Sequence, residues 1–460
     1  MKFESKRLLM QIANIFNLEV HQTDVNNAYL NATLNEPVHC TLPKGLEPPG
    51  LEGRVYRLKK ALYGLKQAGL EWYKEFTGEL ARMGFRPFLG DPCVFVRETK
   101  TKAKLLLGVG VDDVISMFDK RDMGEWKEIK DTLNSKYGIK DLGECKKVLG
   151  MTVDRVREKR ELYLGQEGYL QKMINEYLGS EEVRSVMVPG TELKHLTTPP
   201  DGREVLLDER GKREYQSMIG ALLYAALTTR IDITTAVSHL SRFNARPCQH
   251  HLVAVRKVFK YLVGAKKLKL VFKGECPQIR DSTGKIISNT ERVKFGDGIE
   301  ADISLYAYCD ATWAEELVEC KSTSGFVIML NGAPMMFKSR KQETVATSSA
   351  EAEFAALHEC VLELEWFQIM LSEFGLRSAN SPPSKVFCDN RPTVQAAPKS
   401  LVYGRLKSLA AKYQSIKQKH DLGVIQAEWI SGLEQPADGL TKSLLDTKHR
   451  QFTSTFMGEC

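Results

Sequence analysis

The chain has 460 residues, 43% of them apolar and 27% charged, so it has the composition of a folded globular protein and the length for about two to four domains. Its ten cysteines contain no Cys-x-x-Cys pair, which argues against a zinc finger or a disulfide framework, and we expect reduced thiols. The net charge of +7 is compatible with a nucleic-acid partner without requiring one. We expect no membrane segment and an intracellular location, because no apolar run approaches about 18 residues and no secretory signal opens the chain.

The first informative stretch ends in a carboxylate. Apolar residues at helical spacing predict a helix over residues 5–16, and the run that follows predicts a strand ending at Asp24 and Val25. Asp24 is either a turn residue before a helix, which Asn26 and Asn27 favour, or one carboxylate of a site completed further along the chain.

Residues 54–76 interleave basic and aromatic side chains. The basic residues are Arg54, Arg57, Lys59, Lys60 and Lys66, and the aromatic residues include Tyr56, Tyr63, Trp72 and Tyr73. Such a mixture suits the neutralisation of phosphates and the stacking of bases. A helix with a solvated lysine face explains the same pattern, and the residues by themselves leave both interpretations open.

Two adjacent aspartates interrupt the apolar stretch Leu105–Met117, LLLGVGVDDVISM. The flanking runs predict two short buried strands, and an unpaired buried charge is costly, so the chain is expected to turn at Asp112 and Asp113. Oxygen ligands of this kind suit Mg²⁺, which binds one or two carboxylates together with substrate phosphates. An acidic surface hairpin is the alternative explanation.

Three segments occur in a characteristic order: QTDVNNAYLNATLNEPVHCTLPKG, LKKALYGLKQAGLEWY and LLLGVGVDD. In this order they resemble the reverse transcriptase of copia-type LTR retrotransposons. The resemblance continues through KYGIKDLGECKKVLGMTV and the stretch Tyr215–Phe243, and it covers residues 1–445. Several long motifs in sequence are more specific than one aspartate pair.

The resemblance implies a domain order and a fold class. We expect an α+β reverse transcriptase palm, an antiparallel sheet with helices, over residues 1–180. A thumb and connection region would follow over 181–273, then a linker or peripheral hairpin over 274–301. An α/β ribonuclease H-like domain is expected over 302–446, with a tail over 447–460. In the connection region, we interpret His250 and His251 as helix surface rather than metal ligands.

In the palm, the resemblance implies that Asp24, Asp112 and Asp113 hold two Mg²⁺ ions, with Mn²⁺ as a substitute, for the joining of deoxynucleoside triphosphates to a DNA primer on an RNA template. It also implies substrate-binding residues beside this site. Tyr29 would exclude a ribose 2′-hydroxyl, and the other three would lie under the nucleotide and template: Tyr63, Gly64 and Gln67.

The region after Ile303 is predicted to alternate strands and helices, with an acidic residue at each junction. One strand carries Asp310, a hairpin turns at Asn331-Gly332, and a long helix begins at Ser348 and stops at Gly375. Asp389 ends a further apolar strand, and Asp438 lies at the start of a helix.

This pattern resembles the ribonuclease H fold that follows reverse transcriptase in the same family. The resemblance implies four ligands for two Mg²⁺ ions that activate water to cut the RNA strand of an RNA–DNA hybrid: Asp310, Glu353, Asp389 and Asp438. Glu353 is preferred to Glu351 because it directly precedes the aromatic residue of the family's A-E-(Y/F) motif. Glu351 is explained by capping of the helix.

The sequence also departs from the family. Arg405–Gln414 matches a run that usually contains histidines, and Ser408 and Gln414 stand in their places. The family's fingers, with the cations that grip a triphosphate, would precede Met1, so we expect the polymerase half to be impaired. The competing hypothesis is a decayed or co-opted nucleic-acid-binding protein without catalysis. The family resemblance implies a location in the cytoplasm, a virus-like particle or the nucleus.

Overall fold

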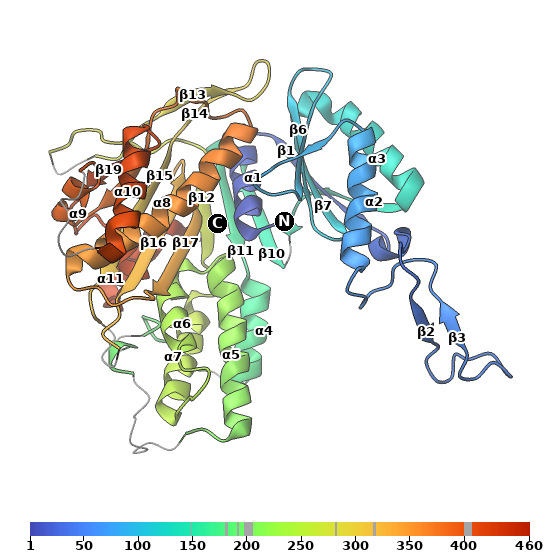
Figure 1. The fold of residues 1–460 in the computed structure, drawn as a ribbon, viewed down its shortest axis with the longest axis horizontal. Coiled ribbons are helices and arrows are strands. Elements are labelled where there is room, and N and C mark those ends of the chain that lie inside the picture. The colour runs from blue at the N-terminus through green and yellow to red at the C-terminus, as the bar shows by residue number, and fades with distance from the viewer. Residues whose placement is uncertain are drawn as a thin grey trace. The chain divides into compact units, whose positions relative to one another are not determined.

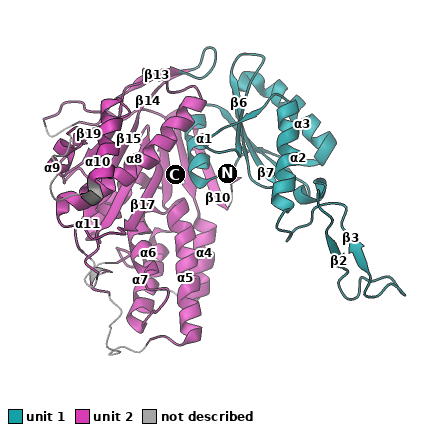
Figure 2. Cartoon of the chain, viewed as in Figure 1, with its two compact units in different colours: residues 1–13, 17–145, 294–299 teal, residues 14–16, 146–293, 300–460 magenta. Residues whose placement is uncertain are grey.

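The computed structural model describes residues 1–148, 150–179, 183–190, 193–196, 206–280, 283–315, 319–399 and 407–460, and Figure 1 shows its helices and strands. The chain divides into two compact units (Figure 2). Unit 1 comprises residues 1–13, 17–145 and 294–299, and unit 2 comprises residues 14–16, 146–293 and 300–460. Within the described ranges, each helix is too short or too polar to cross a membrane.

Unit 1 is built on a six-stranded antiparallel sheet in the order β4-β5-β6-β7-β1-β8. Its strands are β1 (Glu19–Val25), β4 (Arg86–Pro87), β5 (Val94–Glu98), β6 (Lys104–Val109), β7 (Asp113–Phe118) and β8 (Ile139–Glu144). A separate two-stranded hairpin joins β2 (His39–Thr41) to β3 (Val55–Arg57). The turn predicted at Asp112 and Asp113 is confirmed as the connection between β6 and β7.

Helices α2 (Ala68–Arg82) and α3 (Met123–Tyr137) supply apolar side chains to the core of unit 1. Alternate residues of β6, among them Leu105 and Leu107, pack against Trp72 and Phe76 of α2. Gly108 directly follows Leu107, so it lies on the opposite face of β6, where it meets Leu9 of α1 (Phe3–Ile15), the helix expected over residues 5–16. The sheet is therefore buried on both faces, which explains why the strand sequences are apolar runs rather than alternating ones.

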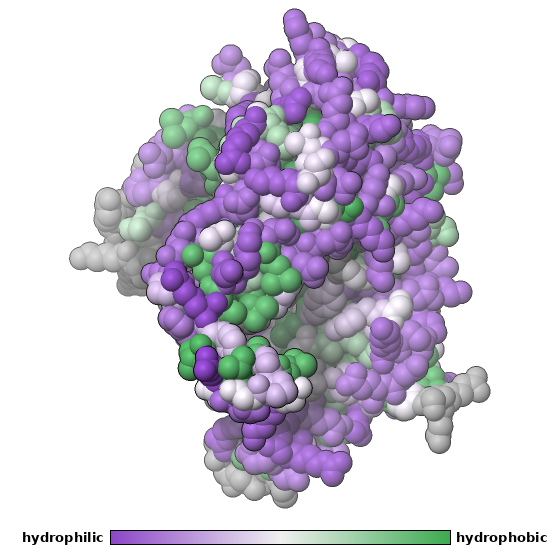
Figure 3. Space-filling view, turned by 90° about the vertical axis from the view of Figure 1, so that its right-hand side faces the viewer, coloured by the Kyte–Doolittle hydropathy of each residue, from purple (hydrophilic) through white to green (hydrophobic). Residues whose placement is uncertain are grey.

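The basic and aromatic stretch of residues 54–76 does not form one helix. Its first residues belong to β3, and α2 begins only at Ala68. The connecting loop leaves Lys59, Lys60 and Lys66 exposed, together with the apolar residues Leu62 and Tyr63. In Figure 3 the visible surface is mostly hydrophilic, with apolar residues gathered in smaller groups.

Unit 2 contains a helical layer in which α4, α5, α6 and α7 pack together around a shared apolar core (Figure 1). The helices are α4 (Glu167–Leu178), α5 (Glu209–Thr228), α6 (Thr234–Ser241) and α7 (Gln249–Ala265). His251 corrects one interpretation, since it is fully buried rather than on the helix surface. Its ring stacks on Phe243 at a centroid distance of 3.9 Å, and its Nδ1 accepts a hydrogen bond from the Cys248 amide.

The last residues of the chain belong to this unit. Helix α11 (Asp446–Phe456) buries Phe452 and Phe456, and the strand after it, β20 (Met457–Gly458), pairs with β12. The sheet has the order β20-β12-β11-β10-β9. Its other strands are β9 (Lys147–Val148), β10 (Met151–Val156), β11 (Glu161–Gly165) and β12 (Lys269–Lys273). The segment expected to be a tail over 447–460 therefore contributes both a helix and a strand.

A second five-stranded sheet of unit 2 has the order β17-β16-β15-β18-β19 and mixes parallel and antiparallel pairs. The strands are β15 (Leu305–Thr312), β16 (Thr323–Leu330), β17 (Ala333–Lys341), β18 (Ser384–Cys388) and β19 (Ile425–Trp429). The long helix α8 (Ser349–Glu373) packs on it. The predicted turn is confirmed, since Asn331 and Gly332 join β16 to β17 with positive φ angles of 51° and 80°.

Shorter elements complete the fold: α9 (Arg391–Ala396), α10 (Lys407–Asp421), β13 (Glu291–Lys294) and β14 (Glu300–Ile303). The 3₁₀ helices used below are η1 (Ala28–Asn31) and η6 (Pro436–Leu440). The division by contacts falls after Cys145, because β9, β10, β11 and α4 pack with unit 2.

Candidate functional sites

The first candidate site lies on neighbouring strands of unit 1. β1 and β7 are antiparallel, and their register places Asp24 directly opposite Asp113. The amide of Val25 donates a hydrogen bond of 2.7 Å to the carbonyl of Asp112, which ties the end of β1 to the hairpin. The structure therefore brings together the three carboxylates that the sequence placed far apart.

Polar and charged side chains surround Asp113. Gln22 lies two residues before Asp24 on β1, and its Nε2 donates to Oδ1 of Asp113 at 2.7 Å. Burial raises the pKa of the Asp113 carboxyl, and the charges of Asp112 and Asp24 raise it further. The hydrogen bond from Gln22 and the positive charge of Lys6 oppose this shift. A cation bound between the carboxylates would relieve the same repulsion.

The hairpin tip that carries the aspartates is fixed by hydrogen bonds. The amide of Gly110 donates to the carbonyl of Asp113 at 2.6 Å and closes the turn. The indole Nε1 of Trp72, on α2, donates to the carbonyl of Val111 at 2.6 Å. Because Trp72 is buried in the core of unit 1, this bond anchors the turn directly before Asp112.

The residues expected to bind substrate gather close to the first site. The rings of Tyr29, on η1, and Tyr63 lie 4.5 Å apart, and the pKa of Tyr63 is raised by partial burial and by the charge of Asp112. Gly64 follows with a φ of +98°, a left-handed turn that suits glycine. Gln67 caps the start of α2, where its carbonyl accepts from Glu71.

The second candidate site lies at one end of the mixed sheet of unit 2. β15 and β18 are adjacent and parallel, so Asp310, near the end of β15, and Asp389, directly after β18, emerge at the same edge. Asp438, on η6, joins them, and one carboxylate oxygen from each residue lies within 4.8 Å of the others. Parallel pairing thus explains how distant carboxylates come to share one site.

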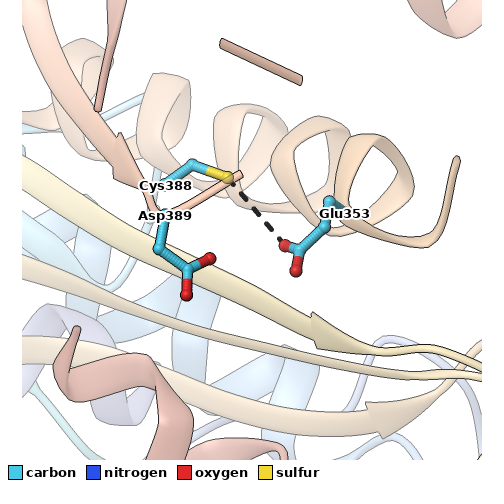
Figure 4. Close-up of side chains that lie close together, drawn as sticks. All are labelled: Glu353, Cys388 and Asp389. Carbon is cyan, nitrogen blue, oxygen red and sulfur yellow. Dashed lines mark hydrogen bonds between the residues drawn. The ribbon is translucent and has the colours of Figure 1, made fainter. Parts of the chain in front are cut away.

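Glu353 approaches the same place from the first turns of α8. One of its oxygens, the Cys388 sulfur and an Asp389 oxygen all lie within 4.8 Å of one another (Figure 4). The thiol of Cys388 donates to Oε2 of Glu353 at 3.9 Å. Burial raises the pKa of Glu353 to about 11, and the charge of Asp310 adds to the shift.

Glu351 has a different environment. Its Oε2 accepts a hydrogen bond of 2.7 Å from the amide of Thr347, and its own amide donates to the hydroxyl of Ser348. These bonds satisfy free amides at the start of α8, which confirms the helix start predicted at Ser348. The side chain of Glu351 thus caps the start of α8, whereas the side chain of Glu353 points toward the aspartates.

The sequence analysis did not predict that a positively charged side chain, that of Lys442, belongs to the second site. Lys442 Nζ lies 2.7 Å from Oδ1 of Asp438 and 3.5 Å from Oδ2 of Asp310. Thr441 donates its hydroxyl hydrogen to the same oxygen of Asp310. The spacing of Asp438 and Lys442, four residues apart, was the available signal, since such pairs meet on one side of a helical turn.

Close packing positions η6 against the sheet. Gly325, opposite Asp310 in the pairing of β15 with β16, has no side chain, and a Cβ there would lie 2.5 Å from Thr441. Gln435 donates its amide hydrogen to the carbonyl of Cys309 at 3.0 Å, and Thr235 donates its hydroxyl hydrogen to the carbonyl of Gly439 at 2.6 Å. These contacts bring Asp438 to the end of β15.

The two sites differ in compactness. Among the described residues, two groups of three possible metal ligands have all their ligand atoms within 4.8 Å of one another, and both groups belong to the second site. Asp24, Asp112 and Asp113 do not form such a group. The carboxylates of the first site are therefore neighbours without the tight convergence seen around Asp389.

The run that replaces the expected histidines is described only in part. Arg405 lies outside the described residues, and Gln414 lies on α10. Tyr413 stacks on Phe354 of α8 at a centroid distance of 3.6 Å, which places α10 against the helix that carries Glu353.

Comparison with known proteins relates the whole chain to one group. Residues 1–190 match the sequence model of the family described as reverse transcriptase (RNA-dependent DNA polymerase). The retrovirus-related Pol polyprotein from transposon TNT 1-94 of Nicotiana tabacum is 30% identical over 444 residues, which is 96% of this chain and 31% of that protein. The corresponding polyprotein from transposon RE1 of Arabidopsis thaliana is 30% identical over 460 residues, 98% of this chain and 28% of that protein.

The chain therefore spans less than a third of the length of either relative. A solved structure of the foamy viral protease-reverse transcriptase dRH, in complex with ds DNA, resembles it with a TM-score of 0.44 and 12% identity, covering 89% of this chain and 56% of that one. A structural likeness at this level carries no argument about the family of the chain, which is indicated by the sequence relatives.

Proposed function

Because this chain belongs to the copia-type reverse transcriptase–ribonuclease H family of retrotransposons, we propose that unit 1 is the palm of an RNA-directed DNA polymerase and that the mixed sheet of unit 2 is a ribonuclease H. The observation that carries the proposal is the cluster formed by Asp310 and Asp389, at the ends of adjacent parallel strands, and Asp438 of η6, with Glu353 beside it. Four acidic groups around one point need a compensating cation.

The residues of the ribonuclease H site fit divalent metal ions. Asp310, Asp389 and Asp438 offer oxygen ligands, the kind that Mg²⁺ and Mn²⁺ accept. Bound ions would lower the pKa of a water molecule and stabilise charge on the phosphate that is cut. The protein's own contribution is to hold the carboxylates in place, through the backbone of β15 and the packing of η6.

In the polymerase site, Asp24, Asp112 and Asp113 would hold the ions that accompany an incoming triphosphate. The neighbouring rings of Tyr29 and Tyr63 would support the sugar and base beside them, and Tyr29 would exclude a ribose 2′-hydroxyl. Gly64 and Gln67 continue this surface toward α2.

RNA template, DNA primer and RNA–DNA hybrid are the proposed partners. Exposed lysines on the loop before α2, among them Lys59 and Lys66, can neutralise backbone phosphates. The exposed ring of Tyr63 offers a stacking surface for a base. The limits of palm, thumb and ribonuclease H along the chain remain part of this proposal.

The test uses two glutamates on one helix. Glu353→Gln should reduce magnesium-dependent cleavage of an RNA–DNA hybrid by on the order of 100-fold, because it removes a charge from the acidic cluster. Glu351→Gln is the matched control and should retain cleavage while weakening the start of α8. Equal cleavage by both variants, or loss in Glu351→Gln alone, would contradict the assignment.

A non-catalytic nucleic-acid-binding protein is the second candidate. The replacement of the expected histidines at Ser408 and Gln414 favours it. The same assay separates the two, since a hybrid that is bound but left uncut by the unaltered chain, with Mg²⁺ or Mn²⁺ present, supports the second candidate and excludes the first.

A further inference from the structure

The acidic cluster of unit 2 contains a sulfur atom that the proposed chemistry does not use. Cys388 is the last residue of β18, and its thiol points toward Glu353 (Figure 4). With Asp389 it completes a set of one sulfur and two carboxylates whose ligand atoms lie within 4.8 Å of one another. The three residues come from a strand end, the loop directly after it and a helix, so the fold fixes their positions.

The distance between the sulfur of Cys388 and the carboxyl of Glu353 is close to the distance between two ligands of a tetrahedral metal ion. A zinc ion lies about 2.3 Å from a thiolate sulfur and about 2.0–2.2 Å from a carboxylate oxygen. At a tetrahedral angle, these bonds separate the sulfur from the oxygen by about 3.6 Å. The sulfur of Cys388 lies 3.9 Å from Oε2 of Glu353, so coordination requires a contraction of only a few tenths of an ångström.

The chemistry of the set favours a different ion from the rest of the cluster. Asp310, Asp389 and Asp438 are oxygen ligands that suit Mg²⁺, whereas a thiolate selects zinc or cadmium. Both ligand sets contain Asp389, so Mg²⁺ in one set and a thiophilic ion in the other would compete for this residue. An ion can reach this set from the side of Asp389, because Asp389 is half-buried whereas Cys388 is fully buried.

Charge gives a second reason for a cation at this place. Glu353 is only 6% exposed, and its carboxyl accepts a hydrogen bond from the thiol of Cys388, a weak donor. The ion pairs of Lys442 go to Asp310 and Asp438 rather than to Glu353. A dication bound at this place would replace the proton that the buried carboxyl of Glu353 otherwise keeps.

We propose that Glu353, Cys388 and Asp389 bind one thiophilic dication, Zn²⁺ or Cd²⁺. The S–H bond of Cys388 and the O–H bond of the Glu353 carboxyl break, both protons pass to solvent, and sulfur–metal and oxygen–metal bonds form with no change of oxidation state. The fourth position of the ion remains open to water. The inference goes beyond the proposed function because it requires only this geometry. Its consequence for that function is that the thiophilic ion would displace the Mg²⁺ bound to Asp389.

The experiment titrates Cd²⁺ into the full chain and follows the thiolate-to-cadmium charge-transfer absorption. Cys320 and Cys460 are exposed and are first replaced by serine to remove competing thiols. The band should saturate near one equivalent in this background, vanish with Cys388→Ser and persist with Cys360→Ser. Cys360 is an equally buried thiol of α8 and serves as the matched control. A band that is absent from the background, or unchanged in Cys388→Ser, overturns the proposal.

A second variant keeps the test decisive if Cys388→Ser fails to fold. Glu353→Gln retains every thiol and should weaken Cd²⁺ binding by about tenfold or more, and unchanged affinity overturns the proposal. Cleavage of an RNA–DNA hybrid with Mg²⁺ is measured on the same background chain. Cleavage without a cadmium band defeats only the metal-site proposal, whereas a cadmium band without cleavage defeats only the proposed function.

Discussion

Asp24 lies directly opposite Asp113 in the antiparallel pairing of β1 with β7. Two carboxylates on facing backbone positions repel each other, and this pairing is retained only if something compensates for the repulsion. Gln22 and Lys6 provide part of the compensation in the absence of metal. The arrangement therefore costs stability, as expected where a fold holds ligands for a function.

The first prediction follows from that cost. Asp113→Asn keeps an oxygen that can accept from Gln22 and removes one buried charge, so the free energy of unfolding of unit 1 should rise by about 1 kcal/mol. The same variant should lose the increase in melting temperature that Mg²⁺ gives the unaltered chain. Thermal melting with and without Mg²⁺ measures both effects, and the exposed Asp131→Asn is the control. A variant that is less stable and still responds to Mg²⁺ would contradict this interpretation.

The second prediction concerns the anchor of the hairpin tip. Trp72→Phe removes the indole hydrogen bond to Val111 and should cost about 1–2 kcal/mol of stability. Primer extension should fall more steeply than stability explains, because the turn that positions Asp112 loses its anchor. Trp126→Phe is a matched control in the same core, since the Nε1 of this fully buried residue has no hydrogen-bond partner. Equal losses of primer extension in the two variants would show that the hydrogen bond is not needed.

The third prediction concerns Lys442, the positively charged side chain in the second candidate site. Lys442→Met removes the ammonium paired with Asp438 and Asp310, so Mg²⁺ should bind about tenfold more tightly. The metal-free protein should also become less stable, because the carboxylates lose their counter-charge. Isothermal titration calorimetry measures the affinity, and the exposed Lys448→Met serves as control. Weaker Mg²⁺ binding in Lys442→Met would indicate that the lysine organises the site instead of competing for it.

The fourth prediction is a pH dependence of stability. Burial lowers the pKa of His251 to about 3, and in the folded state its Nδ1 must remain unprotonated to accept from the Cys248 amide. The unfolded residue has a pKa of about 6.5, so between these values the unfolded state binds more protons and stability falls as the pH decreases, by up to about 1.4 kcal/mol per pH unit. Chemical denaturation of the full chain between pH 7 and pH 4 measures this slope.

A control variant separates His251 from other groups that titrate in this range. His251→Gln should reduce the slope without abolishing it, because burial also lowers the pKa of His239 and of His449. An unchanged slope in His251→Gln would mean that this imidazole does not contribute.

Much of the local structure could be predicted from the sequence. The apolar runs around Asp112 predicted the β6–β7 hairpin, Asn331-Gly332 predicted the β16–β17 turn, and Ser348 predicted the start of α8. These signals are local, because each depends on residues within a few positions of one another. The assignment of the candidate ligands came instead from family motifs, and their roles remain predictions.

The errors have a common physical origin. The interpretation of His251 as helix surface is wrong because its ring also meets that of Tyr215, far earlier in the chain, and the residues around His251 do not reveal this contact. The helix and strand after Asp446 were expected to be a tail, since a short segment reveals little of the apolar surface that it will cover. In both cases burial is decided by residues distant in the chain.

The sequence by itself determined the strands, the turns, the caps and the family, because periodicity and motif order are properties of the linear chain. Only the tertiary structure decided which groups share a site. The parallel pairing of β15 with β18 brings Asp310 to Asp389, the packing of η6 adds Lys442, and the end of β18 places Cys388 beside Glu353. Charge compensation and metal selectivity depend on distances of a few ångströms between residues far apart in sequence. Those distances are set only when the strands pair and the helices pack on the sheet.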